Sequence, residues 1–200
     1  MKTLIVLAHP NLKEGSIANR IIIEKVQPIP QVTIRDLYQE CPSFRFDVQA
    51  EHDALRSADS VIFQFPFYWY SVPGILKEWM DQVLTYGFAY GSTGDKLRGK
   101  DFLVSTTVGG PADAYCEGGY NNFTIAELLK PLRQMSNLAG LRYHRPIVSH
   151  GMIFIPNVYN TREEVEERAR EHAARLHRYI IGDLGITRAP GRKHKSDWYI

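Results

Sequence analysis

Short apolar runs that alternate with helical patterns constrain this chain more than any other feature. Near-continuous runs occupy residues 2–8, 60–65 and 102–107, and weaker strand patterns occur at 31–36 and within 146–155. Runs of this length and composition are typical of strands buried on both faces of a parallel sheet. Because a helical stretch follows nearly every run, the order predicts an α/β fold with helices on both faces of five parallel strands.

The helical segments sharpen this expectation. A polar helix is expected at 48–58, and apolar residues repeat at helical spacing between Ile75 and Leu84. A third helix is expected over 123–139, with a kink or break at Pro131. The last helix begins with a capping-box pattern at Thr161. Five strands fit the flavodoxin-like doubly wound order 2-1-3-4-5 better than a six-stranded dinucleotide fold.

Composition points to one globular domain over residues 1–200. The chain is 44% hydrophobic and 23% charged, which excludes a disordered protein. A formal net charge of only +2 argues against nucleic acid as a partner. The C-terminal tail is locally basic, and we interpret it as a solvated end in preference to a phosphate-binding arm; its basic residues are Arg188, Arg192, Lys193, His194 and Lys195.

Cysteine usage and hydropathy suggest where the protein works. Cys41 and Cys116 are far apart and show no metal-type spacing, so two free thiols in a reducing compartment and no metal site are expected. We see no signal peptide at the N-terminus, and no apolar run approaches the roughly 18 residues of a membrane span. The sequence therefore predicts a cytoplasmic protein.

In an open α/β sheet, ligands bind beyond the carboxyl ends of the strands, where the strand order reverses. After the first strand, His9 precedes a helix start marked by Ser16 and Asn19, and Ser16 is the expected N-cap. A helix N-terminus offers free N–H groups to a phosphate. A capped helix with an uninvolved histidine explains these residues about equally well. The loop is neither a GxGxxG fingerprint nor a P-loop.

The loops after the third and fourth strands are also unusual. Four consecutive aromatic residues cannot all face one core, so some should contact a ligand or a partner surface; they follow Pro66 and are Phe67, Tyr68, Trp69 and Tyr70. A wall for a flat ring system is the functional interpretation, and a dimer patch or strand edge is the alternative. Gly109 and Gly110 end the fourth strand and allow close approach of the backbone to a ligand.

At these residues the sequence resembles the flavodoxin-like NAD(P)H:quinone reductases. The resemblance rests on A-H-P at 8–10 with S-x-x-N at 16–19, on F-P-F-Y-W-Y-S-V-P-G-I-L-K-E-W-M-D at 65–81, and on T-T-V-G-G at 106–110. It covers about the first 155 residues. The segment 86–91 and the total length look closest to the ancillary oxidoreductases of glutathione-gated potassium efflux systems.

The resemblance implies a role for each matching residue. The flavin phosphate and ribityl chain would be held by His9, Ser16, Ile17, Ala18 and Asn19. The isoalloxazine ring would contact Pro66, Phe67, Tyr68, Trp69, Tyr70, Thr107, Val108, Gly109 and Gly110. Tyr115 looks like the family tyrosine near the reactive face of the flavin. The larger members pair it with a histidine a few residues later, where this chain has Tyr120 and Asn121.

The implied activity is ping-pong transfer of hydride from NAD(P)H through bound flavin to a quinone. FMN is favoured over FAD because relatives that use FAD carry extra C-terminal chain. A homodimer is expected, with each site completed at the subunit interface. One alternative is a regulatory subunit that docks on the cytosolic domain of a potassium efflux channel, at the inner face of the membrane. Another is a flavodoxin-type electron carrier, a class that is usually strongly acidic.

Overall fold

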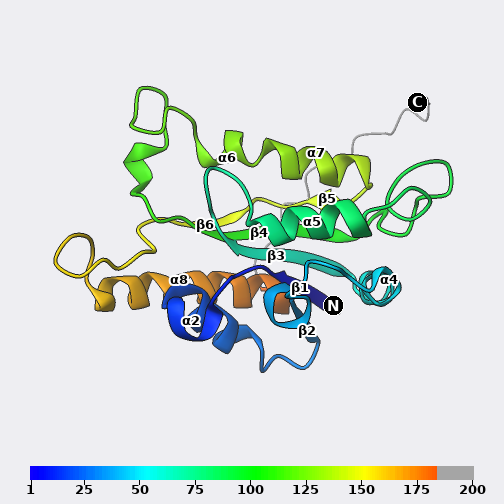
Figure 1. Cartoon of the computed structure of the whole chain (residues 1–200), viewed down its shortest axis with the longest axis horizontal. Helices are drawn as coiled ribbons and strands as arrows, with labels where there is room; N and C mark the ends of the chain where they lie inside the picture. Colours follow the sequence, from blue (N-terminus) through cyan, green and yellow to red (C-terminus); the bar gives the residue numbers. More distant parts are fainter. Residues whose placement is uncertain (184–200) are drawn as a thin grey trace.

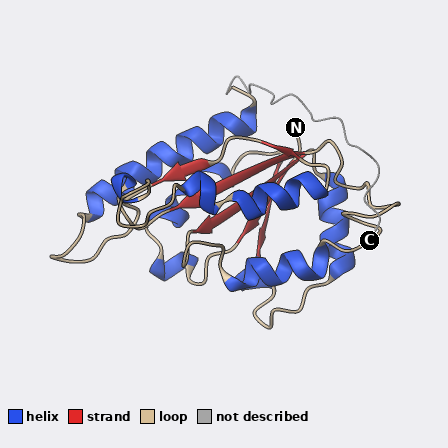
Figure 2. Cartoon of the chain, turned by 90° about the horizontal axis from the view of Figure 1, so that it is seen from above, coloured by secondary structure: helices blue, strands red, loops and turns tan. Residues whose placement is uncertain are grey.

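One twisted parallel sheet, covered by helices on both faces, forms the centre of the molecule (Figures 1 and 2). The computed structural model describes residues 1–183, and the basic tail residues of 188–195 lie outside that range. All strand pairs are parallel, in the order β2-β1-β3-β4-β5, with β6 also beside β4. This confirms the flavodoxin-like order. The strands are β1 Thr3–Leu7, β2 Val32–Asp36, β3 Ser60–Pro66, β4 Asp101–Thr107, β5 Arg142–Tyr143 and β6 Ile147–Ser149.

The fifth strand differs from its prediction. In place of one strand within 146–155, two short strands, β5 and β6, pair successively with β4. The hydrogen bonds to β4 are interrupted between β5 and β6 because Pro146 has no N–H to donate and restricts the backbone of the residue before it. The chain after Ser149 leaves the sheet and forms a loop that leads to the last helix.

The helices divide between the two faces. In Figure 1, α2 and α8 lie on one side of the sheet, and α5, α6 and α7 lie on the other. Contacts between α2 and α8 are extensive, whereas α4 packs against α5. The helices are α1 Leu12–Gly15, α2 Ala18–Val26, α3 Leu37–Glu40, α4 Val48–Ser57, α5 Gly74–Val83, α6 Ile125–Leu128, α7 Lys130–Leu138 and α8 Arg162–Ile181, with a 3-10 turn at Ala112–Ala114.

Local sequence signals explain most helix boundaries. The Thr161 capping box is present, with both of its hydrogen bonds. The expected helix over 123–139 is broken into α6 and α7 at Leu129, because Pro131 occupies the first turn of α7. The one-turn helices α1 and α3 were not predicted; side chains of Asn11 and Asp36 cap them. No helix within residues 1–183 is long and apolar enough to cross a membrane.

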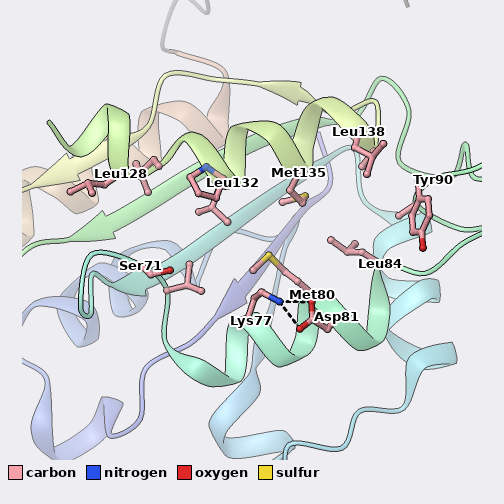
Figure 3. Close-up of a pocket in the computed structure, with 15 residues that line it drawn as sticks. Ser71, Lys77, Met80, Asp81, Leu84, Tyr90, Leu128, Leu132, Met135 and Leu138 are labelled. Carbon is pink, nitrogen blue, oxygen red and sulfur yellow. Dashed lines mark hydrogen bonds and ion pairs between the residues drawn. The ribbon is translucent and has the colours of Figure 1, made fainter. Parts of the chain in front are cut away.

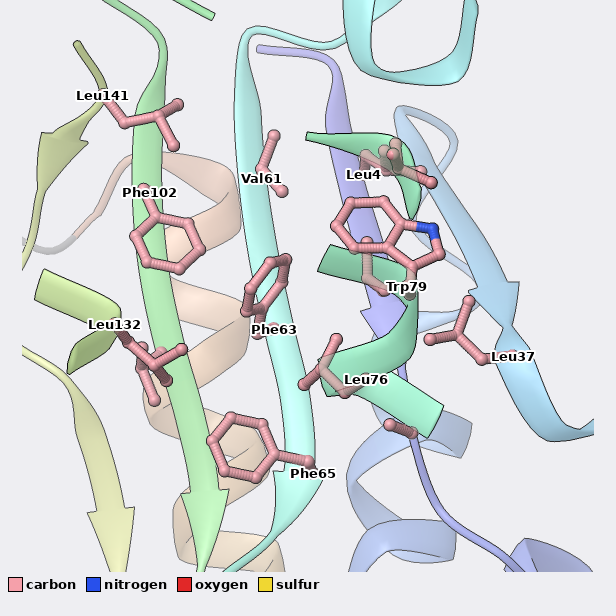
Figure 4. Packing of buried hydrophobic residues seen from close by; sticks show 14 of the residues in the cluster. Leu4, Leu37, Val61, Phe63, Phe65, Leu76, Trp79, Phe102, Leu132 and Leu141 are labelled. Atoms are coloured by element: carbon pink, nitrogen blue, oxygen red, sulfur yellow. The ribbon is translucent and has the colours of Figure 1, made fainter. Parts of the chain in front are cut away.

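The larger apolar core lies between the sheet and the α5–α7 side (Figure 4). Phe63 sits at its centre, with its ring edge-on to Trp79 at 5.6 Å and to Phe102 at 4.8 Å between centroids. On the other face, Ile5 and Ile62 belong to a second cluster with residues of α2 and α8. Two well-packed faces hold the carboxyl ends of β1, β3 and β4 in register at one edge of the sheet.

Candidate functional site

The three loops singled out in the sequence meet at the carboxyl edge of the sheet. Asn19, in the first turn of α2, donates from Nδ2 to Thr107 Oγ1 at the end of β4, at 3.0 Å. Gln64 of β3 donates from Nε2 to Asn19 Oδ1 at 2.8 Å. The Phe67 N–H donates to the Thr107 carbonyl at 2.8 Å. The loops after β1, β3 and β4 are therefore joined by direct hydrogen bonds.

The first loop ends in a helix N-terminus with unused donors. Ser16 Oγ accepts from the Asn19 N–H at 3.0 Å, as expected for a cap, although α2 itself begins at Ala18. The backbone N–H groups of Ile17 and Ala18 have no acceptor within residues 1–183. Such a terminus attracts an anion through its free donors and its partial positive charge.

His9 lies buried beside this terminus. Its Nδ1 accepts from the Asn11 N–H at 3.2 Å. Burial lowers the pKa of His9 to about 4, so the ring is neutral at pH 7. A neutral ring that accepts at Nδ1 carries its proton on Nε2. His9 is therefore an uncharged hydrogen-bond donor in the loop after β1.

The aromatic loop is a tight hairpin. Tyr68 and Ser71 exchange two backbone hydrogen bonds, of 3.1 and 2.9 Å, across a two-residue turn. Both turn residues are left-handed, with φ of 46° at Trp69 and 62° at Tyr70, a conformation that Asn and Gly adopt more readily. This backbone is strained, which is typical of functional sites. The N–H groups of Trp69 and Tyr70 find no acceptor in the described chain.

The four aromatic side chains of this loop separate. Phe67 is buried in the core next to Pro66, the last residue of β3. Tyr68 and Tyr70 are partly exposed, and Trp69 is 92% exposed. Three aromatic rings therefore remain for a ligand or a partner surface, as the sequence suggested.

The third loop, which follows β4, presents backbone N–H groups rather than side chains to a ligand. Thr107 is buried, and the Val108 side chain is fully inside the core. The Val108 N–H donates to the Ser149 carbonyl and the Val108 carbonyl accepts from the Met152 N–H, so Val108 is the expected contact least free to bind a ligand. The N–H groups of Gly109 and Gly110, by contrast, have no acceptor among residues 1–183.

Tyr115 lies against these glycines. A Cβ on Gly110 would stand 3.3 Å from the Tyr115 ring, so glycine permits this close approach. The Tyr115 ring is also 6.5 Å from the Phe67 ring between centroids. Burial, and then the nearby Tyr70 and Tyr159, raise the pKa of Tyr115, so its hydroxyl keeps its proton at neutral pH.

Two functional candidates escaped the sequence analysis. His150, directly after β6, places its ring 5.3 Å from the Tyr115 ring between centroids, and its buried Nδ1 has no partner in the described residues. Burial lowers the pKa of His150, while a hydrogen bond with the Gly110 backbone raises it in part. Gln64 is the second, a polar residue within an apolar strand. His150 stands inside the segment expected to hold the fifth strand, and Gln64 gives no sequence signal because its partner Asn19 is 45 residues away.

Tyr120 and Asn121 occur where the larger members of the similar family carry a histidine. Asn121 Oδ1 accepts from the Tyr70 hydroxyl at 2.9 Å, which ties the 111–124 loop to the aromatic hairpin. The Tyr120 side chain is almost fully exposed. Of the histidines in the described chain, His150 is the one whose ring stands beside Tyr115.

An apolar groove of about 330 Å³ lies between α5 and α6–α7 (Figure 3). Met80 and Leu84 line it from α5, and Leu132 and Met135 from α7. On its rim, Lys77 and Asp81 form an exposed ion pair at 2.6 Å. Ser71 and Val72, at the end of the aromatic hairpin, also line the groove, so it is continuous with the loops described above without covering them.

Comparison with known sequences identifies relatives over most of the chain. A family model described as "Flavodoxin-like fold" matches residues 1–179. General stress protein 14 of Bacillus subtilis is 40% identical over 90% of this chain and 97% of its own. An uncharacterized NAD(P)H oxidoreductase, YrkL, of the same organism is 38% identical over 84% and 94%. The potassium-efflux ancillary protein KefG of Yersinia enterocolitica is 36% identical over 92% and 94%.

Solved structures agree in fold. General stress protein 14 of Treponema denticola, in complex with FMN, superposes with a TM-score of 0.78 at 36% identity, over 88% of this chain and 98% of its own. An NADPH-quinone reductase from P. pentosaceus gives 0.74 at 28%, over 88% and 97%. A protein described as a thermophilic tryptophan halogenase from Streptomycin violaceusniger gives 0.79 at 38%, over 89% and 98%. With nearly its whole length matched in sequence and in fold, the chain belongs to the flavodoxin-like fold family.

Proposed function

We propose that this protein is an FMN-dependent NAD(P)H:quinone oxidoreductase. The observation that carries the proposal is the set of unused backbone donors at one sheet edge: two at the start of α2, two in the aromatic hairpin and two at Gly109–Gly110. Relatives described as NAD(P)H oxidoreductase and NADPH-quinone reductase, and an FMN complex of a structural neighbour, support it.

This donor set fits FMN. The α2 terminus suits the doubly charged phosphate, with Ile17 and Ala18 donating from the backbone, Ser16 from its hydroxyl and His9 from Nε2. The donors of Trp69, Tyr70, Gly109 and Gly110 suit the polar edge of a flat ring. Bound FMN would supply the hydride chemistry, and the protein would supply position and electrostatics.

Tyr115 is the protein group we assign to the reaction. Its hydroxyl stays protonated at neutral pH, so it can donate a hydrogen bond or a proton to the oxygen of a bound quinone. The exposed rings of Tyr68, Trp69 and Tyr70 would form the walls between which nicotinamide and quinone bind in turn. No covalent bond to the protein is required in this scheme.

The test is purification of the full chain, a visible spectrum and identification of the released flavin. A yellow protein that releases FMN and oxidises NADH or NADPH with a soluble quinone is the expected result. A colourless protein that binds neither added FMN nor FAD would overturn the proposal. Flavin without quinone turnover would instead favour a flavodoxin-type electron carrier.

A regulatory role beside the enzymatic one is supported by the KefG relatives, which are 33–39% identical to this chain. The second candidate function is therefore a cytoplasmic ancillary subunit that docks on a potassium efflux channel. Pull-down of the cytosolic channel domain by the flavin-loaded protein tests it, and absence of binding at micromolar concentrations counts against it.

A homodimer is part of the proposal, with the groove between α5 and α7 as its interface. The groove is apolar and continues into the aromatic hairpin, so a second copy seated there would reach the edge of the site. Leu138 lines the groove and is exposed in the single chain. Sedimentation should give twice the 22.9 kDa chain mass, and Leu138→Asp should shift it to monomer. A fully active wild-type monomer would refute this interface.

A further inference from the structure

A buried chain of polar side chains lies directly beneath the proposed flavin site. Gln64 is 0% exposed and Asn19 and Thr107 are nearly as buried. Gln64 Nε2 donates to Asn19 Oδ1, and Asn19 Nδ2 donates to Thr107 Oγ1. The backbone N–H of Asn19 donates to Ser16 Oγ. The Asn19 side chain is thus bonded both to β3, which precedes the aromatic hairpin, and to β4, which precedes the paired glycines.

This arrangement is costly to the fold. Gln64 lies on the same face of β3 as Ile62, which packs in the apolar cluster against α2 and α8. An aliphatic residue at position 64 would avoid desolvation of an amide. Gln64 Oε1 is in addition buried without a partner among the described residues. Unsatisfied buried polar atoms are rare because each loses its hydrogen bonds to water without gaining a partner. A strand built only for stability would not retain this residue.

The position of these linked polar side chains indicates which interaction offsets the cost of burying them. Asn19 lies in the first turn of α2, next to the free N–H groups of Ile17 and Ala18 that suit a phosphate. Thr107 precedes Gly109 and Gly110, whose free N–H groups suit the ring. The distance between these two donor sets is fixed through Asn19. Because Thr107 Oγ1 already accepts from Asn19, its own hydrogen remains available to donate.

We infer that Gln64, acting through Asn19 and Thr107, is a positioning residue that holds the phosphate subsite and the ring subsite at the separation FMN requires. The inference rests on the proposed function, because it assumes that the site takes a flavin nucleotide. It assigns a role to Gln64 and changes the role of Asn19, whose side-chain amide is committed to Gln64 and Thr107 rather than free for the phosphate.

Binding of FMN and of riboflavin, which lacks the phosphate, separates positioning from stability. The dissociation constant of riboflavin divided by that of FMN measures how much the phosphate contributes to binding. Thr107→Val keeps the shape of the side chain but removes the acceptor of Asn19. Although Thr107 is at the ring end, this change should lower the ratio about 5-fold, the value of one lost hydrogen bond. Gln64→Met should lower it similarly.

Thr106→Val is the matched control. Its hydroxyl is equally buried but donates to the Phe65 carbonyl and does not contact Asn19. This variant should keep the wild-type ratio. Thr107→Ser retains the hydroxyl and should restore the ratio lost in Thr107→Val, which decides the question even if Gln64→Met does not fold.

The contradicting result is equally clear. If Thr107→Val weakens FMN and riboflavin by the same factor, the polar chain contributes only to the ring subsite or to stability, and the inference is wrong. These assays measure binding of the isolated flavins and no turnover. A wild-type protein that binds FMN but reduces no quinone would therefore contradict the proposed activity, whereas an unchanged ratio contradicts the proposed spacing.

Discussion

The two faces of the sheet differ in what they place at its carboxyl edge. The face toward α5 and α7 is mostly apolar, with Phe63, Phe65 and Phe102 in one cluster, and its buried Thr106 bonds to the Phe65 carbonyl of the neighbouring strand. The face toward α2 and α8 is apolar in its middle, at Ile62 and Leu103, and is polar toward the carboxyl edge. Its inward side chains near the edge are Gln64, Ser105, Thr107 and Ser149.

Helices α2 and α8 supply the partners for this polar layer. Asn19 of α2 bonds to Gln64 and Thr107, and His172 of α8 bonds through Nε2 to Ser105 at 2.8 Å and through Nδ1 to Ser149 at 2.9 Å. Directional hydrogen bonds fix side-chain positions more narrowly than apolar contacts do. The face toward α5 and α7 therefore holds the larger apolar cluster, while the other face adds directional hydrogen bonds that position the loops that would bind FMN.

The largest effect is expected on the apolar face. Phe63→Ala removes a fully buried ring that packs against Trp79 and Phe102, and should lower the free energy of unfolding by about 3–5 kcal/mol. Urea denaturation measures the loss. Phe123→Ala is the control, since Phe123 is 56% exposed, and should change stability by less than about 0.5 kcal/mol. Equal losses in the two variants would contradict the assignment of stability to this face.

Tyr115 stands where the two faces meet, between Phe67 of the apolar cluster and His150 after β6. Tyr115→Phe should lower quinone turnover toward the small end of the roughly 10²–10⁴-fold range for acid assistance, with flavin content unchanged. Stopped-flow measurement of flavin reduction and of reoxidation by quinone tests each half-reaction. No change in either would make Tyr115 a lining residue only, and complete loss of activity would show a larger role.

The sequence predicted the apolar face more fully than the polar one. Continuous apolar runs identify β1, β3 and β4 because burial on both faces leaves a local signal, and Pro131 marks the break between α6 and α7. Gln64 could not be interpreted because its partner Asn19 is 45 residues away. The three loops were located correctly, since strand ends are readable locally.

Side-chain direction at those loops was harder to predict. The sequence grouped Val108 with the ring contacts, but the alternation of β4 and two backbone hydrogen bonds turn it into the core. His150 was missed because the strand ends at Ser149, well before Ile155, so the first residue after the strand was expected further along the chain. Each discrepancy arises from a partner distant in sequence, which local patterns do not encode.

The polar face should be sensitive to acid. Burial lowers the pKa of His172 to about 3, below the unfolded value near 6.5. As pH falls from 6.5 toward 3, the unfolded chain takes up this proton and the folded chain does not, so stability falls by up to about 1.4 kcal/mol per pH unit. His172→Leu should be less stable at pH 7, because Ser105 and Ser149 lose a partner, but should show a shallower slope.

Denaturant unfolding at pH 7, 6 and 5 compares the two slopes. His9, whose pKa is lowered to about 4 by burial, adds to the acid sensitivity of both proteins and therefore cancels in the difference. Identical slopes would mean that His172 takes up its proton over the same pH range in the folded and the unfolded chain, in which case burial does not lower its pKa.

The smallest effect is expected at Ser16, where the polar face begins. Ser16 Oγ caps α2 through the Asn19 N–H, and a bound phosphate would compete for or share this hydroxyl. Ser16→Ala should weaken FMN binding by about 1 kcal/mol, the value of one hydrogen bond, and should leave riboflavin binding nearly unchanged. Asn11, which caps α1 through the Glu14 N–H, provides the control: Asn11→Ala removes a comparable cap one helix earlier. If Ser16→Ala lowers the unfolding free energy as much as Asn11→Ala and keeps full FMN affinity, Ser16 is only a helix cap, and the phosphate end of the site depends on backbone donors and His9.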